Sequence, residues 1–293
     1  MNRRARLTNA MAFGAVRTLA VAFVLLVVVV LVYTVIQGRS ELARAAFYTS
    51  PPSTDRVGSG AGPQIFNTFY LLVSTVILTV PTGLAAGIYF AEYAGSGPFV
   101  NAVRRATETL ATLPSIVVGL FGYALFVQAT HSHPSRLAAA LALTVISLPY
   151  AVRISEDALR SLPMTLRESS LALGATRWQT ITRVLLPAAL PQLVTGVILI
   201  AGRVFGEAAA VLFTGTVGTP TDHGNYSLNP FLPGDTLAVN LYVFRSQVDP
   251  AQVTDAATYA DGVAALLILL VLVFNVAARY AGRRAVRRLQ GTV

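Results

Sequence analysis

Long apolar runs without a charged residue are the feature that most constrains what this chain can fold into. The clearest runs from Leu19 to Ile36 and carries no charge over about 18 residues. A helix needs roughly 20 such residues to cross a hydrocarbon layer of ~30 Å. Across all 293 residues only 12% are charged, whereas a soluble domain has about 25%. The runs therefore predict an all-α, polytopic membrane protein.

We expect six transmembrane helices. Pro81 and Gly83 are expected to break the second, Pro114 lies near the start of the third, and Pro149 lies near the end of the fourth. The predicted spans are Leu19 to Ile36, Phe66 to Ala91, Thr109 to Thr130, Leu137 to Val152, Leu190 to Gly215, and Gly262 to Ala278.

The first apolar run could instead be a signal peptide, because Arg3, Arg4, Arg6 and Arg17 precede it. The run is longer than a usual signal-peptide core, and the nearest small-x-small pair, Ala43 with Ala45, lies well beyond its end. We therefore favour a retained helix.

The arginines predict the orientation of the chain. If the N-terminus is cytoplasmic, 16 of the 22 arginines lie on the inside, five lie on the outside, and Arg203 lies within the membrane. Basic residues collect in the cytoplasmic segments of membrane proteins. Both termini are thus expected to be cytoplasmic, which agrees with an even number of spans.

The spans divide the chain into three parts. Residues 1–65 form the first helix and an outside loop, residues 66–281 form the main transmembrane domain, and residues 282–293 form a basic cytoplasmic tail. The main domain includes a cytoplasmic loop at 153–187 and an outside loop at 216–261.

The outside loop at 216–261 contains the stretch TLAVNLYVF, which favours a short interfacial helix or strand. Its aromatic residues suit the outer membrane interface. An ordinary exposed loop is the alternative, and the residues do not separate the two. These aromatic residues are Tyr226, Phe231, Tyr242 and Phe244.

Several classes of site are excluded by composition. The chain has no cysteine, so disulfides, thiolate metal sites and cysteine nucleophiles are absent. It has no lysine, so it lacks a Walker A phosphate loop, and any ATP must be hydrolysed by another chain. We find no enzymatic constellation, and nothing near His131 and His133 completes a metal site. The arginines flank apolar runs, which favours membrane orientation over nucleic-acid binding.

Two short amphipathic helices are predicted in the cytoplasmic loop. Gly174 is placed to end the first helix as a C′ glycine, and Thr176 with Gln179 forms a capping box for the second. An apolar stripe follows on the second helix, at Trp178, Ile181, Val184 and Leu185. From these features alone, lying on the lipid surface and docking into a groove of a partner remain equally supported.

The stretch ESSLALGATRWQTITRVLLP resembles the EAA loop of ABC-importer permeases, whose pattern is E-A-A-x3-G-x9-I-x-L-P. Glu168, Ser169 and Ser170 stand at the E-A-A positions, and Gly174 follows after three residues. Val184, Leu186 and Pro187 occupy the I-x-L-P positions. The two serines and the valine depart from the consensus. The resemblance implies that this loop inserts into a cleft of an ATPase subunit, with Ser169 to Gly174, including Leu173, at the centre of the contact.

Three further stretches resemble phosphate-import permeases of the PstA type. They are PTGLAAGIYFAEYA (81–94), LPSIVVGLFGY (113–123) and GRVFGEAAAVLFTG (202–215). The resemblance implies a permease of the bacterial plasma (inner) membrane that carries phosphate, with no catalytic residues and no cofactor of its own. Its implied partners are a PstC-like permease, two copies of an ATPase that binds ATP and magnesium, and an extracytoplasmic phosphate-binding protein. A permease for sulfate or molybdate, or an ion-coupled secondary transporter, is the alternative.

Arg203 and Glu207 are predicted to lie near the middle of the fifth span. Their i, i+4 spacing would place them on one helix face, and Gly202 and Gly206 would let another helix approach. A structural ion pair is one interpretation, although burial of such a pair often gives little net stability. We favour an anion pathway, in which Arg203 binds phosphate oxygens and Glu207 limits the affinity.

Overall fold

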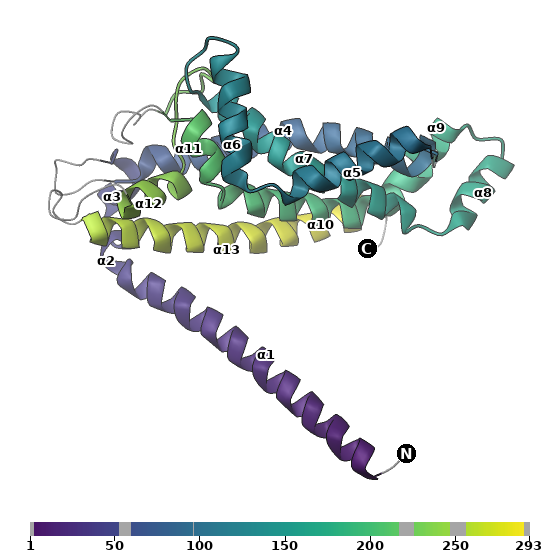
Figure 1. Cartoon of the computed structure of the whole chain (residues 1–293), viewed down its shortest axis with the longest axis horizontal. Coiled ribbons are helices and arrows are strands. Elements are labelled where there is room, and N and C mark those ends of the chain that lie inside the picture. Colours follow the sequence, from purple (N-terminus) through teal and green to yellow (C-terminus); the bar gives the residue numbers. More distant parts are fainter. Residues whose placement is uncertain (1–2, 53–59, 96, 217–225, 247–255, 290–293) are drawn as a thin grey trace.

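The structure is a computed structural model, and it describes residues 3–52, 60–95, 97–216, 226–246 and 256–289. Every regular element in these ranges is a helix (Figure 1). Among the described residues, five helices are long and apolar enough to span a membrane, and a bent pair of helices gives a sixth when it is counted as one span. The predicted all-α, polytopic fold is confirmed.

The long helices are α1 (Arg3–Gln37), α4 (Gly62–Ile88), α7 (Arg136–Arg160), α10 (Leu186–Phe205) and α13 (Ala256–Leu289). The bent pair consists of α5 (Pro98–Thr112) and α6 (Ser115–Tyr123). Short helices are α2 (Arg39–Leu42), α3 (Ala45–Thr49), α8 (Met164–Ala172), α9 (Arg177–Thr180), α11 (Ala209–Thr214) and α12 (Leu237–Ser246). Three π-helical turns extend longer helices: η1 (Tyr89–Tyr93), η2 (Ala124–Gln128) and η3 (Ile181–Leu185).

Helices α4, α7, α10 and α13 run roughly along one axis and form the bundle (Figure 1). We call the end that carries α8 and α9 the inner end, and the end that carries α3 and α12 the outer end. Small residues bring the helices close together. A Cβ atom on Gly83 would lie 2.3 Å from that of Ala151, and one on Gly196 would lie 2.2 Å from Ile154. These two glycines therefore set the distances of α4 and α10 from α7.

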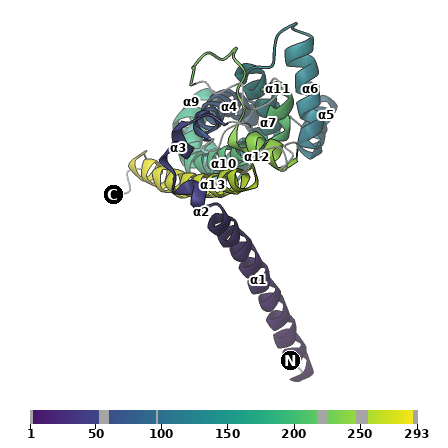
Figure 2. The same cartoon turned by 90° about the vertical axis from the view of Figure 1, so that its left-hand side faces the viewer.

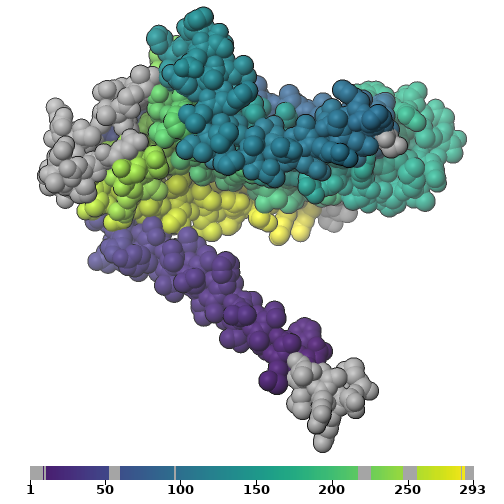
Figure 3. Space-filling view, viewed as in Figure 1, coloured from purple at the N-terminus to yellow at the C-terminus, as the bar shows by residue number. Residues whose placement is uncertain are grey.

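The first helix stands apart from the bundle. Figures 1 and 2 show α1 leaving the bundle beside α2, and Figure 3 shows open space along most of its length. None of its apolar window is buried within this chain. Because exposed leucines and valines of this density are not stable in water, α1 needs lipid or another chain around it.

The third span differs from its prediction. Instead of one helix over Thr109 to Thr130, α5 and α6 meet at an angle of 104° around Leu113 and Pro114. Arg104 of α5 bonds to Phe90 at the inner end, whereas Ser135, just before α7, bonds to Thr214 toward the outer end. The bent pair therefore carries the chain from the inner end to the outer end, which completes six crossings.

The break expected in the second span does not occur, and the fourth span continues beyond its predicted end. Helix α4 continues through Pro81, and α7 continues through Pro149 to Arg160. The break appears instead in the fifth span, where α10 ends at Phe205 and α11 begins at Ala209. The prediction of one continuous helix from Leu190 to Gly215 was therefore wrong.

The outside loop contains a buried helix. The stretch predicted as an interfacial helix or strand forms α12, and Phe244 is 4% exposed against Tyr259. Placing Phe244 in an interface belt was wrong, whereas Tyr226 and Phe231 are exposed. Arg136 has no exposed surface and donates to the carbonyl oxygens of Ser227 and Asn229, which fastens the outer loop to α7.

Candidate functional site

The middle of the bundle contains an exposed arginine held on an aromatic ring. The guanidinium of Arg203 lies 4.2 Å from the ring centre of Tyr150, a cation–π distance. The Tyr150 hydroxyl donates to the carbonyl oxygen of Ala111 at 3.2 Å, next to the bend between α5 and α6. Tyr150 lies well within α7, about 21 Å from the helix start at 1.5 Å per residue. Arg203 is thus placed at the depth where the third span bends.

Glu207 does not share a helix face with Arg203. It lies in the break between α10 and α11, and no ion pair joins it to Arg203 among the described residues. The spacing argument assumed a continuous helix, and the turn at Gly206 invalidates it. Arg203 nevertheless lies in the last turn of α10, and Glu207 follows it in the break between α10 and α11. Irregular backbone at this depth is tolerated where protein or a water-filled cavity surrounds it.

Gly202 and Gly206 make no close helix contact with any described part of the chain. A Cβ atom on Gly202 would meet Asn275 of α13 at an ordinary 3.5 Å, and one on Gly206 would meet only its own helix at 3.9 Å. Close approach occurs instead at Gly119 of α6, where a Cβ atom would lie 2.8 Å from the Cα of Ala210. The predicted role of Gly202 and Gly206 in helix packing therefore stays a prediction, which now concerns a helix of another chain.

The two short helices at the inner end, α8 and α9, are built as the sequence predicts. Gly174 has φ +83° and ends α8, with its amide bonded to Leu171 and the Ala175 amide bonded to Ser170. This pattern is a Schellman motif, which requires a left-handed residue at that position. The capping box of Thr176 and Gln179 is confirmed, with bonds of 2.9 and 3.3 Å.

The tip of this hairpin exposes large apolar side chains. Leu173 is 89% exposed and Trp178 is 60% exposed, although Ile181 and Leu185 of the same predicted stripe are buried in the bundle. Glu168 and Ser169 are also exposed, while the Ser170 hydroxyl is 2.9 Å from that of Thr180. Exposed apolar groups rimmed by polar ones mark an interaction surface. The predicted coupling residues thus share one hairpin.

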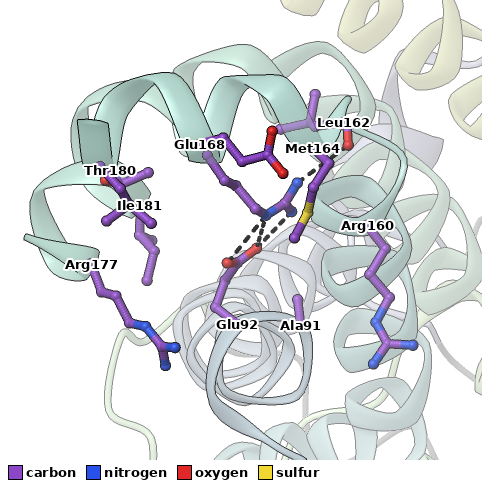
Figure 4. A pocket seen from close by; sticks show the side chains of 11 residues that line it. Ala91, Glu92, Arg160, Leu162, Met164, Glu168, Arg177, Thr180 and Ile181 are labelled. Carbon is purple, nitrogen blue, oxygen red and sulfur yellow. Dashed lines mark hydrogen bonds and ion pairs between the residues drawn. The ribbon is translucent and has the colours of Figure 1, made fainter. Parts of the chain in front are cut away.

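An ion pair that sequence reasoning did not identify joins this hairpin to the bundle. Arg167 of α8 binds Glu92 of η1, with the shortest bond at 2.7 Å, and each side chain is 13% exposed (Figure 4). Arg167 also donates to the carbonyl oxygens of Leu159 and Leu162 at 2.7 and 3.2 Å. Leu159 lies in the last turn of α7, where carbonyl oxygens lack intrahelical donors, and Leu162 follows the end of that helix. One guanidinium therefore joins α4, α7 and α8.

A cavity of about 440 Å³ lies beside this ion pair (Figure 4). Glu92 and Arg160 line one wall, and Arg177 and Thr180 of the hairpin line another. Arg160 is already paired with Glu156 at 3.0 Å, as is Arg104 of α5 at 2.7 Å. Arg104 and Arg160 also donate to the carbonyl oxygen of Phe90 in η1, at 3.2 Å each. These two arginines therefore tie together η1 and the inner ends of α5 and α7, and the hairpin is attached to η1 and α7 through Arg167.

Comparison with known proteins agrees with this arrangement. Residues 83–291 match the model of the binding-protein-dependent transport system inner membrane component. The chain belongs to this family of ABC-importer permeases. In this family ATP is hydrolysed by separate nucleotide-binding subunits, so this permease subunit is not an enzyme and has no cofactor of its own.

Several relatives extend over most of the chain. A probable ABC transporter permease, YqgI of Bacillus subtilis, is 41% identical and covers 99% of both chains. The phosphate transport permease PstA of Pasteurella multocida is 32% identical over 89% of this chain and 90% of its own. PstA 1 of Mycobacterium tuberculosis is 32% identical over 80% of this chain and 74% of its own.

Two solved structures show the same fold. A bacterial alginate ABC transporter, solved with its alginate-bound periplasmic protein, aligns over 97% of this chain and 96% of its own with a TM-score of 0.69 at 16% identity. The MetNI methionine transporter aligns over 77% of this chain and 94% of its own with a TM-score of 0.58 at 23% identity. The chain is therefore a multi-pass plasma-membrane permease that works with a second permease, ATPase subunits and a binding protein.

Proposed function

We propose that this permease carries inorganic phosphate, with a PstC-like permease as its partner, two copies of an ATPase, and an extracytoplasmic phosphate-binding protein. The observation that carries the proposal is Arg203, an exposed cation in an apolar span whose described contacts include no acid. A bare charge facing lipid is expensive, so its exposed side faces water, an anion or the second permease. Relatives named as phosphate permeases support phosphate as that anion.

Arg203 suits a transient anion site. Its guanidinium donates forked hydrogen bonds that match phosphate oxygens, and the ring of Tyr150 orients it without neutralising it. Glu207, in the break between α10 and α11, adds a negative charge at the same depth. We propose that this charge weakens phosphate binding enough for release. We propose that the helix breaks at Leu113–Pro114 and Gly206 let the lining of the pathway move as it opens to one side of the membrane and then to the other.

Phosphate uptake by an Arg203→Gln variant tests the proposal. The variant is expected to lose uptake, by about 100-fold or more, because a charge-assisted bond worth about 3 kcal/mol is removed at the pathway. Insertion and assembly with the ATPase should stay normal. Arg105→Gln removes an exposed arginine on α5 and serves as the control.

Normal phosphate uptake by Arg203→Gln contradicts the role of this arginine. Competition by sulfate or molybdate at concentrations similar to phosphate contradicts the proposed substrate while leaving the permease function intact. Uptake that persists after cellular ATP is exhausted contradicts coupling to an ATPase.

We further propose that the hairpin of α8 and α9 docks on the ATPase and that Arg167 transmits its movement. Leu173 and Trp178 supply the apolar contact, together with Glu168, Ser169, Ser170 and Gly174 on the same hairpin. A displacement of α8 then acts on η1 through Glu92 and on the last turn of α7 through the carbonyl oxygen of Leu159. Helix α7 carries Tyr150, so the same displacement reaches Arg203.

A further inference from the structure

A second cavity lies at the inner end, between α10 and the last turns of α13. Its volume is about 260 Å³, and it is separate from the hairpin cavity beside Glu92. Its walls come from two helices, α10 and α13, that are each long enough to cross the membrane. The lining residues are Pro191, Val194, Thr195 and Ile198 of α10 with Arg279, Gly282, Arg283, Val286 and Arg287 of α13.

Three arginines give this cavity a strong positive charge. Arg279, Arg283 and Arg287 recur every four residues, which places them along one face of α13. The lining contains no acidic residue, and none of the three arginines has an ion pair or a side-chain hydrogen bond within the described part of the chain. Their donors are exposed and available to a ligand with several acceptor oxygens.

One wall of the cavity is apolar and depends on a glycine. A Cβ atom on Gly282 would lie 2.7 Å from the side chain of Val194, so a larger residue would press α13 away from α10. Val194 and Ile198 of α10 form this apolar wall, and the arginines line the cavity from α13 at similar depths. The cavity thus combines an apolar wall with a cationic one.

The position of the cavity along the membrane normal indicates which kind of anion it binds. The apolar span of α13 ends at Arg284, so the three arginines surround the boundary between hydrocarbon and water. The arginine distribution predicts that this boundary is cytoplasmic. We propose that the cavity binds the phosphate-bearing headgroup of an anionic phospholipid, with its glycerol and upper acyl chain on Val194 and Ile198. Basic cavities between helices at this level recognise such headgroups, and this proposal goes beyond phosphate transport.

Neighbouring arginines provide a matched test. Arg283 lines the cavity, whereas Arg284 lies against the ring of Tyr280 and does not line it. Arg283→Gln and Arg284→Gln change the net charge equally, on exposed positions of the same helix turn. The complete transporter complex would be purified, delipidated, mixed with phosphatidylglycerol or phosphatidylcholine vesicles, and its bound lipid counted by native mass spectrometry.

The wild-type complex is expected to retain phosphatidylglycerol in preference to phosphatidylcholine. Arg283→Gln should weaken that retention about fivefold, since one interfacial arginine contributes about 1 kcal/mol, and Arg284→Gln should leave it unchanged. Equal losses in both variants, or no loss in either, would overturn the proposal. Displacement of bound lipid by millimolar inorganic phosphate, with saturable phosphate binding that Arg283→Gln abolishes, would assign the cavity to the free anion and overturn the lipid.

Discussion

Glu92 and Arg167 are 75 positions apart in the chain and form a nearly buried ion pair. We expect Glu92→Gln to destabilise the complex by about 3 kcal/mol, because it leaves Arg167 charged and without its carboxylate. If Arg167 also transmits movement, phosphate uptake should fall more than ATP hydrolysis. The measurements are the thermal midpoint of the purified complex and the ratio of phosphate transported to ATP hydrolysed.

Asp157→Asn is the matched control. Its partner Arg153 is also on α7, but the two side chains are 62% and 76% exposed and 3.8 Å apart. An exposed pair of this kind contributes under about 1 kcal/mol, so neither measurement should change. A Glu92→Gln complex that loses stability while keeping the wild-type ratio of transport to hydrolysis would reduce the pair to a structural role.

The sequence points to Arg203 but not to Glu92, because only Arg203 stands out from its neighbours in the sequence. A charge surrounded by apolar residues is conspicuous at its own position, so Arg203 needed no knowledge of its neighbours. Glu92 lies at the end of an apolar span, where an acid is ordinary. Only the meeting of η1 with α8 gives it a role, and no spacing in the sequence reports that meeting.

At the scale of the elements, the end of α8 is the sharpest agreement between prediction and structure. Gly174 has the left-handed conformation that the Schellman motif requires, and nothing lies within 4 Å of a Cβ atom built there. We therefore expect Gly174→Asp to leave the fold nearly intact, at a cost of about 1 kcal/mol for the backbone. On the proposed docking surface it should abolish co-purification of the ATPase.

Gly95→Asp is the control for this element, because Gly95 lies in the inner connection before α5 and its Cβ position is also open. It should leave the ATPase bound. Normal co-purification and transport-stimulated ATP hydrolysis by the Gly174→Asp complex would show that the end of α8 is not the contact.

Helix breaks were the least predictable elements. Pro81 and Pro149 lie within continuous helices, whereas the chain bends at Leu113–Pro114 and at Gly206. A proline costs one hydrogen bond and some steric strain, which tight packing of α4 on α7 offsets. At Gly206 the packing of α11 against α6 is available only if α10 stops, so tertiary contacts decide the break.

At the scale of the whole molecule, the bent pair decides the number of crossings. The chain has no cysteine, so a single introduced cysteine reports its own accessibility. Ser132→Cys, after η2, should react with a membrane-impermeant maleimide added outside intact cells. Ser169→Cys, on α8, should react only after the cells are opened.

Both serines are exposed in the structure, as Ser132 follows η2 and Ser169 lies on α8, so burial within the chain does not limit either reaction. Labelling of Ser132→Cys only in opened cells would mean that α5 and α6 re-enter on the inner side. The arrangement of six crossings would then be wrong, and the orientation drawn from the arginines with it.

Apolar length, arginine placement and the spacing of a loop motif are properties of the chain alone, so the sequence was enough to predict a helical membrane permease. The end of α8 was predictable for the same reason, since a left-handed glycine and a capping box are local. Three other features became apparent only in the folded chain: the bend between α5 and α6, the separation of Arg203 from Glu207, and the ion pair of Glu92 with Arg167. Each of these depends on contacts between segments far apart in sequence, where packing and charge pairing outweigh local preference.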